Sequence, residues 1–164
     1  MMRMYLLDTN VFVEANKSYY RISNFRTFWG WLDAEQARGV IASIQMVGEE
    51  LLDGDDELVA WTKEREQSGW FQPVDDEDPQ LKYRDIADWV MTQPQYTWPN
   101  KTKFLSRADG WLIAKAAVTH ATVVTLEIEV DVHSHQVKIP NVCRAFGVQY
   151  LNTFDMMQQL GAQF

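Results

Sequence analysis

Cysteine is nearly absent from this chain of 164 residues, which contains only Cys143. A single thiol cannot form an internal disulfide, so the chain lacks the usual stabilisation of proteins in oxidising compartments. Long apolar runs are also missing, because none approaches the roughly 20 residues that a membrane helix needs. An acid as early as Asp8 argues against a secretory signal peptide. We therefore expect a cytoplasmic protein that does not enter a membrane.

The chain is also poor in positive charge. It has 15 Lys and Arg residues against 23 Asp and Glu residues, a net charge of −8 and a pI of about 4.8. This balance argues against a protein that coats nucleic acid non-specifically through its charge. It does not exclude a nuclease, because a metal-dependent nuclease needs a cluster of acids and its bound cations reverse the local field.

Aromatic residues, by contrast, are abundant, with seven Trp, eight Phe and six Tyr. Together with a hydrophobic share of 46%, they indicate a large and stiff core. The length suits one ordinary domain, and the sequence shows no repeat, linker or low-complexity tract. We therefore expect a single domain over residues 1–164.

Short apolar runs alternate with segments of helical periodicity. The expected strands are residues 4–7, 40–42, 70–74, 122–126 and 148–151. The expected helices are 11–16, 21–38, 43–54, 55–67, 79–92, 106–120, 140–147 and one from 153, with Ser43 and Ser106 as caps and with 93–102 and 127–137 irregular. The pattern predicts an α/β protein, a three-layer α/β/α sandwich with a central parallel sheet of four or five strands.

An acid stands at the exit of the first expected strand. The apolar residues 4–7 are typical of a strand buried on both faces, and Asp8 follows them directly. In open α/β sheets the functional crevice lies at the carboxyl ends of the strands. Asp8 is therefore a candidate for chemistry, and the alternative is that Asp8 or Asn10 only caps the next helix.

Further acids follow other strands or begin helices. Glu49 and Glu50 lie in the helix after the second strand, Asp109 lies in the first turn of a helix, and Glu127 follows a strand. Carboxylates that converge repel one another unless a cation joins them, and such oxygen ligands suit Mg²⁺ or Mn²⁺. The alternative for Asp109 is a capping box with Ser106.

Four acidic segments occur in order along the chain: Leu6-Leu7-Asp8-Thr9-Asn10, Val47-Gly48-Glu49-Glu50-Leu51, Arg107-Ala108-Asp109-Gly110-Trp111-Leu112-Ile113-Ala114 and Val124-Thr125-Leu126-Glu127. Together they resemble the four acidic motifs of PIN-domain ribonucleases, over nearly the whole chain. The resemblance implies a compact α/β/α domain that cuts RNA with Mg²⁺ or Mn²⁺. Many bacterial members of that family are toxins held inactive by a cognate antitoxin, and a homodimer is a family-level expectation. The segment 137–143 looks like a PIN-like branch to which no role is assigned.

The resemblance also implies roles for single residues. Asp8 takes the place of the first metal-binding acid, supported by Asn10 or Thr9. The second acid is Glu50, because the family's acid directly precedes a leucine, with Glu49 as the rival. Asp109 takes the third place.

The fourth motif departs from the family pattern. Members commonly have Thr-x-Asp there, and this chain has Thr125-Leu126-Glu127. The longer Glu127 can still reach a metal, and Asp131 is the alternative if the loop folds back.

Basic and polar residues near these acids are candidates for contact with RNA. Lys101, Lys103 and Arg107 precede Asp109 and can hold a phosphate backbone, with ordinary surface charge as the alternative. Asn10 and Thr125 complete the predicted substrate contacts. Two aromatic residues of the expected loop 93–102 can stack on bases or anchor the loop, and these are Tyr96 and Trp98.

The sequence therefore predicts a metal-dependent endoribonuclease that hydrolyses phosphodiesters with two metal ions and acts as the toxin of a toxin–antitoxin pair. A catalytically silent PIN-like module that binds RNA or protein is one alternative. A phosphatase or phosphotransfer domain with Asp8 as nucleophile is another. The absence of a second acid two positions after Asp8 counts against the common phosphatase arrangement.

Overall fold

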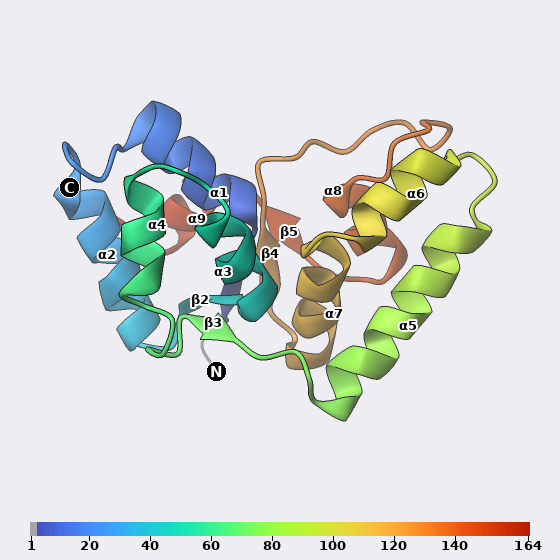
Figure 1. Ribbon diagram of the computed structural model, residues 1–164, viewed down its shortest axis with the longest axis horizontal. Helices are drawn as coiled ribbons and strands as arrows, with labels where there is room; N and C mark the ends of the chain where they lie inside the picture. Colours follow the sequence, from blue (N-terminus) through green and yellow to red (C-terminus); the bar gives the residue numbers. More distant parts are fainter. Residues whose placement is uncertain (1–2) are drawn as a thin grey trace.

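A five-stranded parallel sheet runs through the centre of the molecule, which we describe from a computed structural model of residues 3–164 (Figure 1). The strands are β1 (Tyr5–Leu7), β2 (Ile41–Ile44), β3 (Phe71–Gln72), β4 (Thr122–Val124) and β5 (Tyr150–Leu151). Their order across the sheet is β3-β2-β1-β4-β5, and every pair is parallel. The predicted fold class is confirmed: the chain is α/β with helices flanking a parallel sheet.

The first strand occupies the centre of this sheet. Tyr5 of β1 pairs with Ile41 of β2 on one side and with Thr122 of β4 on the other. Both neighbouring side chains of β1, Leu6 and Leu7, are fully buried. The strand is apolar without alternation because helices cover both faces of a parallel sheet.

Helices cover the sheet in two groups (Figure 1). Figure 1 shows α2 and α4 on the left of the sheet and α5, α6 and α7 on the right. The helices are α1 (Thr9–Glu14), the π-helix η1 (Ala15–Tyr19), α2 (Arg26–Ala37), α3 (Gln45–Leu52), α4 (Glu57–Lys63), α5 (Glu77–Thr92), α6 (Trp98–Leu105), α7 (Asp109–Thr119), α8 (Ile139–Ala145) and α9 (Thr153–Gln159). No helix within residues 3–164 is both long and apolar enough to cross a membrane.

Aromatic packing fixes the helices around the sheet. Phe12 of α1 lies among Trp61, Trp70 and Phe71, with ring centroids 5.7–6.3 Å away. On the other side, Tyr83 of α5 stacks on a ring of α7 at 3.8 Å. Such contacts add to the free energy gained by burying the rings.

The structure corrects the segment between α5 and α7. The sequence predicts an irregular run over 93–102, but α6 begins inside it at Trp98. Pro99 stands in the first turn of α6, where proline lacks only an amide that would be unpaired anyway. Ser106 ends α6 by donating a hydrogen bond to the Lys103 carbonyl, and the N-cap of α7 is Ala108.

The predicted Ser43 cap is also wrong. Ser43 lies in β2, and its hydroxyl donates a hydrogen bond to the Leu7 carbonyl of β1. The N-cap of α3 is Ile44, which has no side-chain cap. The hydroxyl therefore ties two strands together close to Asp8.

The predicted loop 127–137 contains neither helix nor strand, as expected.

Candidate active site

Asp8 lies directly after β1, and its side chain is 3% exposed. One carboxylate oxygen accepts a hydrogen bond from the Thr9 amide at 2.8 Å, which caps α1. The other accepts one from the Thr125 hydroxyl at 2.9 Å. Asp8 therefore does cap α1, as the alternative predicts, but the cap uses only one of its two carboxylate oxygens.

The structure places Thr125, a substrate contact predicted from the sequence, in the interior. Its side chain is buried below Asp8, and its hydroxyl also accepts a hydrogen bond from the Glu127 amide at 3.1 Å. A side chain enclosed in this way cannot reach RNA. It instead fixes the orientation of the Asp8 carboxylate and of the backbone that carries Glu127.

Glu50 is the acid of α3 that faces Asp8. One of its oxygens accepts a hydrogen bond from the Thr9 hydroxyl and the other from the Ala108 amide at 2.8 Å. Glu50 therefore bridges the starts of α1 and α7. Its rival Glu49 is exposed and lines a different cavity, beside Phe71.

Asp109 is the first residue of α7 and is half-buried. Burial and the negative charges of Glu127 and Glu50 raise its pKa to about 7. Within residues 3–164, no other residue donates a hydrogen bond to its carboxylate. The capping-box alternative is wrong, because Ser106 is not at the N-cap of α7.

Glu127 takes the fourth position, and its alternative Asp131 does not. Glu127 lies 3.8 Å from the Lys138 ammonium and accepts a hydrogen bond from the Ile139 amide at 3.4 Å. Burial raises its pKa, while Lys138 lowers it. Asp131 is exposed and accepts a hydrogen bond from the His133 amide within its own turn.

The four acids line one cavity of about 390 Å³. The pKa of Asp8 is raised well above its ordinary value by burial, then by Asp109 and Glu127, so the carboxylates repel one another. Other residues of the wall are Thr9, Asn10, Val13, Asp53 and Arg107. Asp8 and Asp109 therefore line the same cavity, as the sequence predicts.

A hard divalent cation fits these side chains. They offer carboxylate oxygens, the ligands that Mg²⁺ and Mn²⁺ prefer, and within residues 3–164 the Asp109 carboxylate accepts no hydrogen bond from another residue. Within residues 3–164, however, no three such side chains are already grouped closely enough to hold an ion. Asp8, Glu50, Asp109 and Glu127 could hold a metal only after their side chains close on it.

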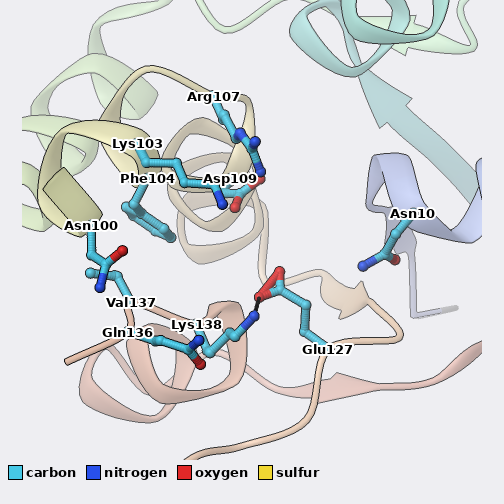
Figure 2. A pocket seen from close by; sticks show the side chains of 10 residues that line it. All are labelled: Asn10, Asn100, Lys103, Phe104, Arg107, Asp109, Glu127, Gln136, Val137 and Lys138. Atoms are coloured by element: carbon cyan, nitrogen blue, oxygen red, sulfur yellow. Dashed lines mark ion pairs between the residues drawn. The ribbon is translucent and has the colours of Figure 1, made fainter. Parts of the chain in front are cut away.

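A second cavity, of about 260 Å³, adjoins the acids and contains the basic residues (Figure 2). Lys103, Arg107 and Lys138 line it together with Asp109 and Glu127. Lys138 is not among the residues predicted from the sequence. Its position just before Ile139-Pro140, the pair that starts a helix, could have indicated that it lies at a helix end near the site.

The remaining candidates for contact with RNA differ in where the structure places them. Asn10 lines both cavities, and its side-chain oxygen accepts a hydrogen bond from the Leu126 amide. Lys101 turns away, because its ammonium donates to the Met91 carbonyl. Tyr96 is buried and anchors its loop, whereas Trp98 is 62% exposed.

The raised pKa of Asp109 predicts how the stability of the metal-free protein changes with pH. Its value of about 7 in the folded chain stands above the ordinary 3.8, so the folded state holds a proton that the unfolded state has released. The free energy of unfolding is therefore expected to fall as pH rises from about 4 to about 7. Denaturant titrations across this range in chelator check it, and Asp109→Asn should flatten the curve. An unfolding free energy that increased over this range would contradict the assignment.

Two solved structures are similar in fold. One is a chain in the structure of FitAB bound to an IR36 DNA fragment, with a TM-score of 0.52 and 20% identity over 91% of this chain and 94% of that chain. The other is a chain in the crystal structure of FitAcB from Neisseria gonorrhoeae, with a TM-score of 0.54 and 20% identity over 92% and 99%. Identity this low shows the fold alone, and that fold is PIN-like.

Sequence comparison identifies a family, whereas the solved structures show only the fold. No curated protein matches the chain. Residues 5–164, however, match the model of a family described as a domain of unknown function, DUF4411. Since the match spans nearly the whole sequence, the chain belongs to the DUF4411 family.

Proposed function

We propose that this protein is a metal-dependent ribonuclease of the PIN type. The observation that supports the proposal is the meeting of four carboxylates, from the end of β1, from α3, from α7 and from the segment after β4, in one cavity. Converging acids are costly in the metal-free fold, since burial and mutual repulsion raise the pKa of Asp8 and of Asp109. A fold that maintains such a cost commonly uses it at a functional site.

The acids would hold Mg²⁺ or Mn²⁺. When bound, such an ion makes a water molecule more acidic and stabilises the charge on the leaving oxygen of a phosphodiester. The chain's own residues orient the site: Thr125 and the Thr9 amide fix the Asp8 carboxylate, and Glu50 fixes the start of α7. Asp109, whose carboxylate accepts no hydrogen bond from another residue within residues 3–164, would be available to bind the ion.

The basic residues favour an RNA substrate. Within residues 3–164, neither Lys103 nor Arg107 forms an ion pair, although both lie near carboxylates in a chain of net charge −8. Unpaired cations beside a catalytic cavity can contact the phosphates on either side of the cleaved bond. These contacts are independent of base sequence, which suits cleavage of single-stranded or structured RNA.

The geometry disfavours the phosphatase alternative. A nucleophilic aspartate must present an oxygen to the phosphorus atom, whereas both oxygens of Asp8 accept hydrogen bonds and its side chain is 3% exposed. A ligand role suits Asp8 better, since each hydrogen-bonded oxygen keeps a second lone pair.

A toxin role with a cognate antitoxin is the finer part of the proposal. It rests on the resemblance to PIN-domain ribonucleases and on the fold shared with FitAB and FitAcB. The homodimer expected for that family belongs to the same part of the proposal.

Glu50 and its neighbour Glu49 in α3 allow a matched test of the proposed ribonuclease activity. Glu50→Gln is expected to lower Mn²⁺-dependent cleavage of single-stranded RNA by about tenfold to hundredfold, because Glu50 lines the acidic cavity. Glu49→Gln should cleave like the wild type, because Glu49 faces another cavity. Cleavage is measured on a labelled oligonucleotide with Mn²⁺ and with chelator. A wild-type protein that cuts no RNA with Mn²⁺, when free of any inhibitor, would remove the proposal.

A further inference from the structure

Acidic and basic side chains lie next to one another around the cavity beside the acids (Figure 2). Figure 2 shows Asp109 beside Lys103 and Arg107 at the top of the view, and Lys138 reaching the Glu127 carboxylate below them. Lys103 and Arg107 of the α6–α7 region complete the basic lining. A negatively charged group that entered this cavity would meet both the acidic site and three cations.

Lys138 is held in place by the chain on both of its sides. It is the N-cap residue of α8, so the helix fixes the backbone that follows it. The segment before it is tied back twice, because Asn141 exchanges two hydrogen bonds with the backbone of Val130. The Leu126 amide also donates to Asn10 of α1. The position of Lys138 is therefore a product of the fold and not of a loose loop.

Lys138 already contacts Glu127, the fourth acid. Its ammonium lies 3.8 Å from one Glu127 oxygen, and the same oxygen accepts the Ile139 amide. The Glu127 side chain is 18% exposed and that of Lys138 34%, so the pair is partly shielded from water. Glu127 thus already forms an ion pair with a cation of the chain itself, whereas Asp8, Glu50 and Asp109 form none within residues 3–164.

The balance of charge suits one divalent ion. The five acids that line the two cavities, Asp53 included, carry two charges more than the three cations Lys103, Arg107 and Lys138. One divalent ion would neutralise that surplus. Two divalent ions would leave two positive charges confined together, and like charges so close repel strongly.

We propose that Lys138 is the second cation of the site, contacting the scissile phosphate beside a single divalent ion held by Asp8, Glu50 and Asp109. This inference rests on the proposed function and deepens it. It replaces the pair of metal ions expected from the sequence with one ion and one fixed ammonium. Glu127 then acts as a positioning residue, which holds Lys138 at the cavity.

Counting bound ions tests the inference without any cleavage. Titration calorimetry with Mn²⁺ is expected to give one ion per chain for the wild type and for Lys138→Arg, which keeps the charge. Lys138→Gln should bind a second ion, because Glu127 loses its partner and the local positive charge falls. Lys63→Gln, on the exposed surface of α4, should match the wild type. Two ions in the wild type, or one ion in Lys138→Gln, would overturn the inference.

Binding of RNA in chelator is the second measurement. A fluorescein-labelled polyuridylate oligonucleotide should bind Lys138→Gln about threefold to tenfold more weakly than the wild type, since one phosphate contact is lost. Thermal melting shows that each variant is folded before it is compared. Unchanged binding in Lys138→Gln would refute the phosphate contact. Absence of RNA cleavage with one ion bound would count against the proposed function, whereas cleavage with two ions bound would count against this inference alone.

Discussion

Replacing Asp109 by asparagine is expected to abolish Mn²⁺-dependent RNA cleavage and to stabilise the metal-free protein at the same time. The loss of activity, about hundredfold or more, follows from the removal of the one carboxylate that no neighbour satisfies. The gain in stability follows because asparagine carries no charge, so the repulsion from Glu127 and Glu50 disappears. Cleavage rates with Mn²⁺ measure the first effect, and melting temperatures at pH 8 in chelator measure the second.

The two effects separate a site residue from a structural one. A residue that only maintains the fold would lower both activity and melting temperature when changed. Asp85→Asn, on an exposed turn of α5, is the control and should alter neither. Mn²⁺ should raise the melting temperature of the wild type more than that of Asp109→Asn, because a ligand stabilises the state that binds it. Equal shifts would mean that Asp109 is not a ligand.

The largest loss of stability is expected from Phe12→Ala. Phe12 is fully buried in α1, and its ring contacts those of Trp61, Trp70 and Phe71. Removing a ring from such a cluster costs the transfer free energy and leaves a cavity, about 3–5 kcal/mol together. For a chain of this length the melting temperature should fall by roughly 10 °C. Denaturant unfolding followed by tryptophan fluorescence gives the free energy directly.

The next residue of the same helix supplies the control. Val13 is 37% exposed, so Val13→Ala should change the free energy of unfolding by about 0.5 kcal/mol or less. Similar losses in the two variants would show that α1 responds to any change and that the aromatic cluster is not its anchor.

Much of the fold could be predicted because its strands are short apolar runs. The run 4–7 contains no charged residue, and burial on both faces makes a strand of a parallel sheet easy to recognise. Helix α6 was missed because Pro94 and Pro99 suggest an irregular segment, although a proline in the first turn is compatible with a helix.

The acids of the site could be placed for a different reason. Asp8 and Glu127 follow strands and Asp109 begins a helix at the carboxyl edge of the sheet, so topology alone brings Asp8 and Asp109 together. The choice between Glu49 and Glu50 needed more, since neighbours on a helix point about 100° apart and only the packing of α3 decides which faces Asp8. Thr125 and Lys138 depend on the path of the chain after β4, which no periodic pattern reveals.

The order of the strands has a consequence for the timing of activity during synthesis. Asp8 emerges from the ribosome first, yet the strand that carries it pairs on one side with β4, far along the chain. Thr125, which orients Asp8, and Glu127 follow β4 immediately. A nascent chain halted before this point has an acid without its neighbours, and domains fold only when the necessary segments are available. The ribonuclease proposed here would therefore acquire its activity only after most of its own chain has been translated.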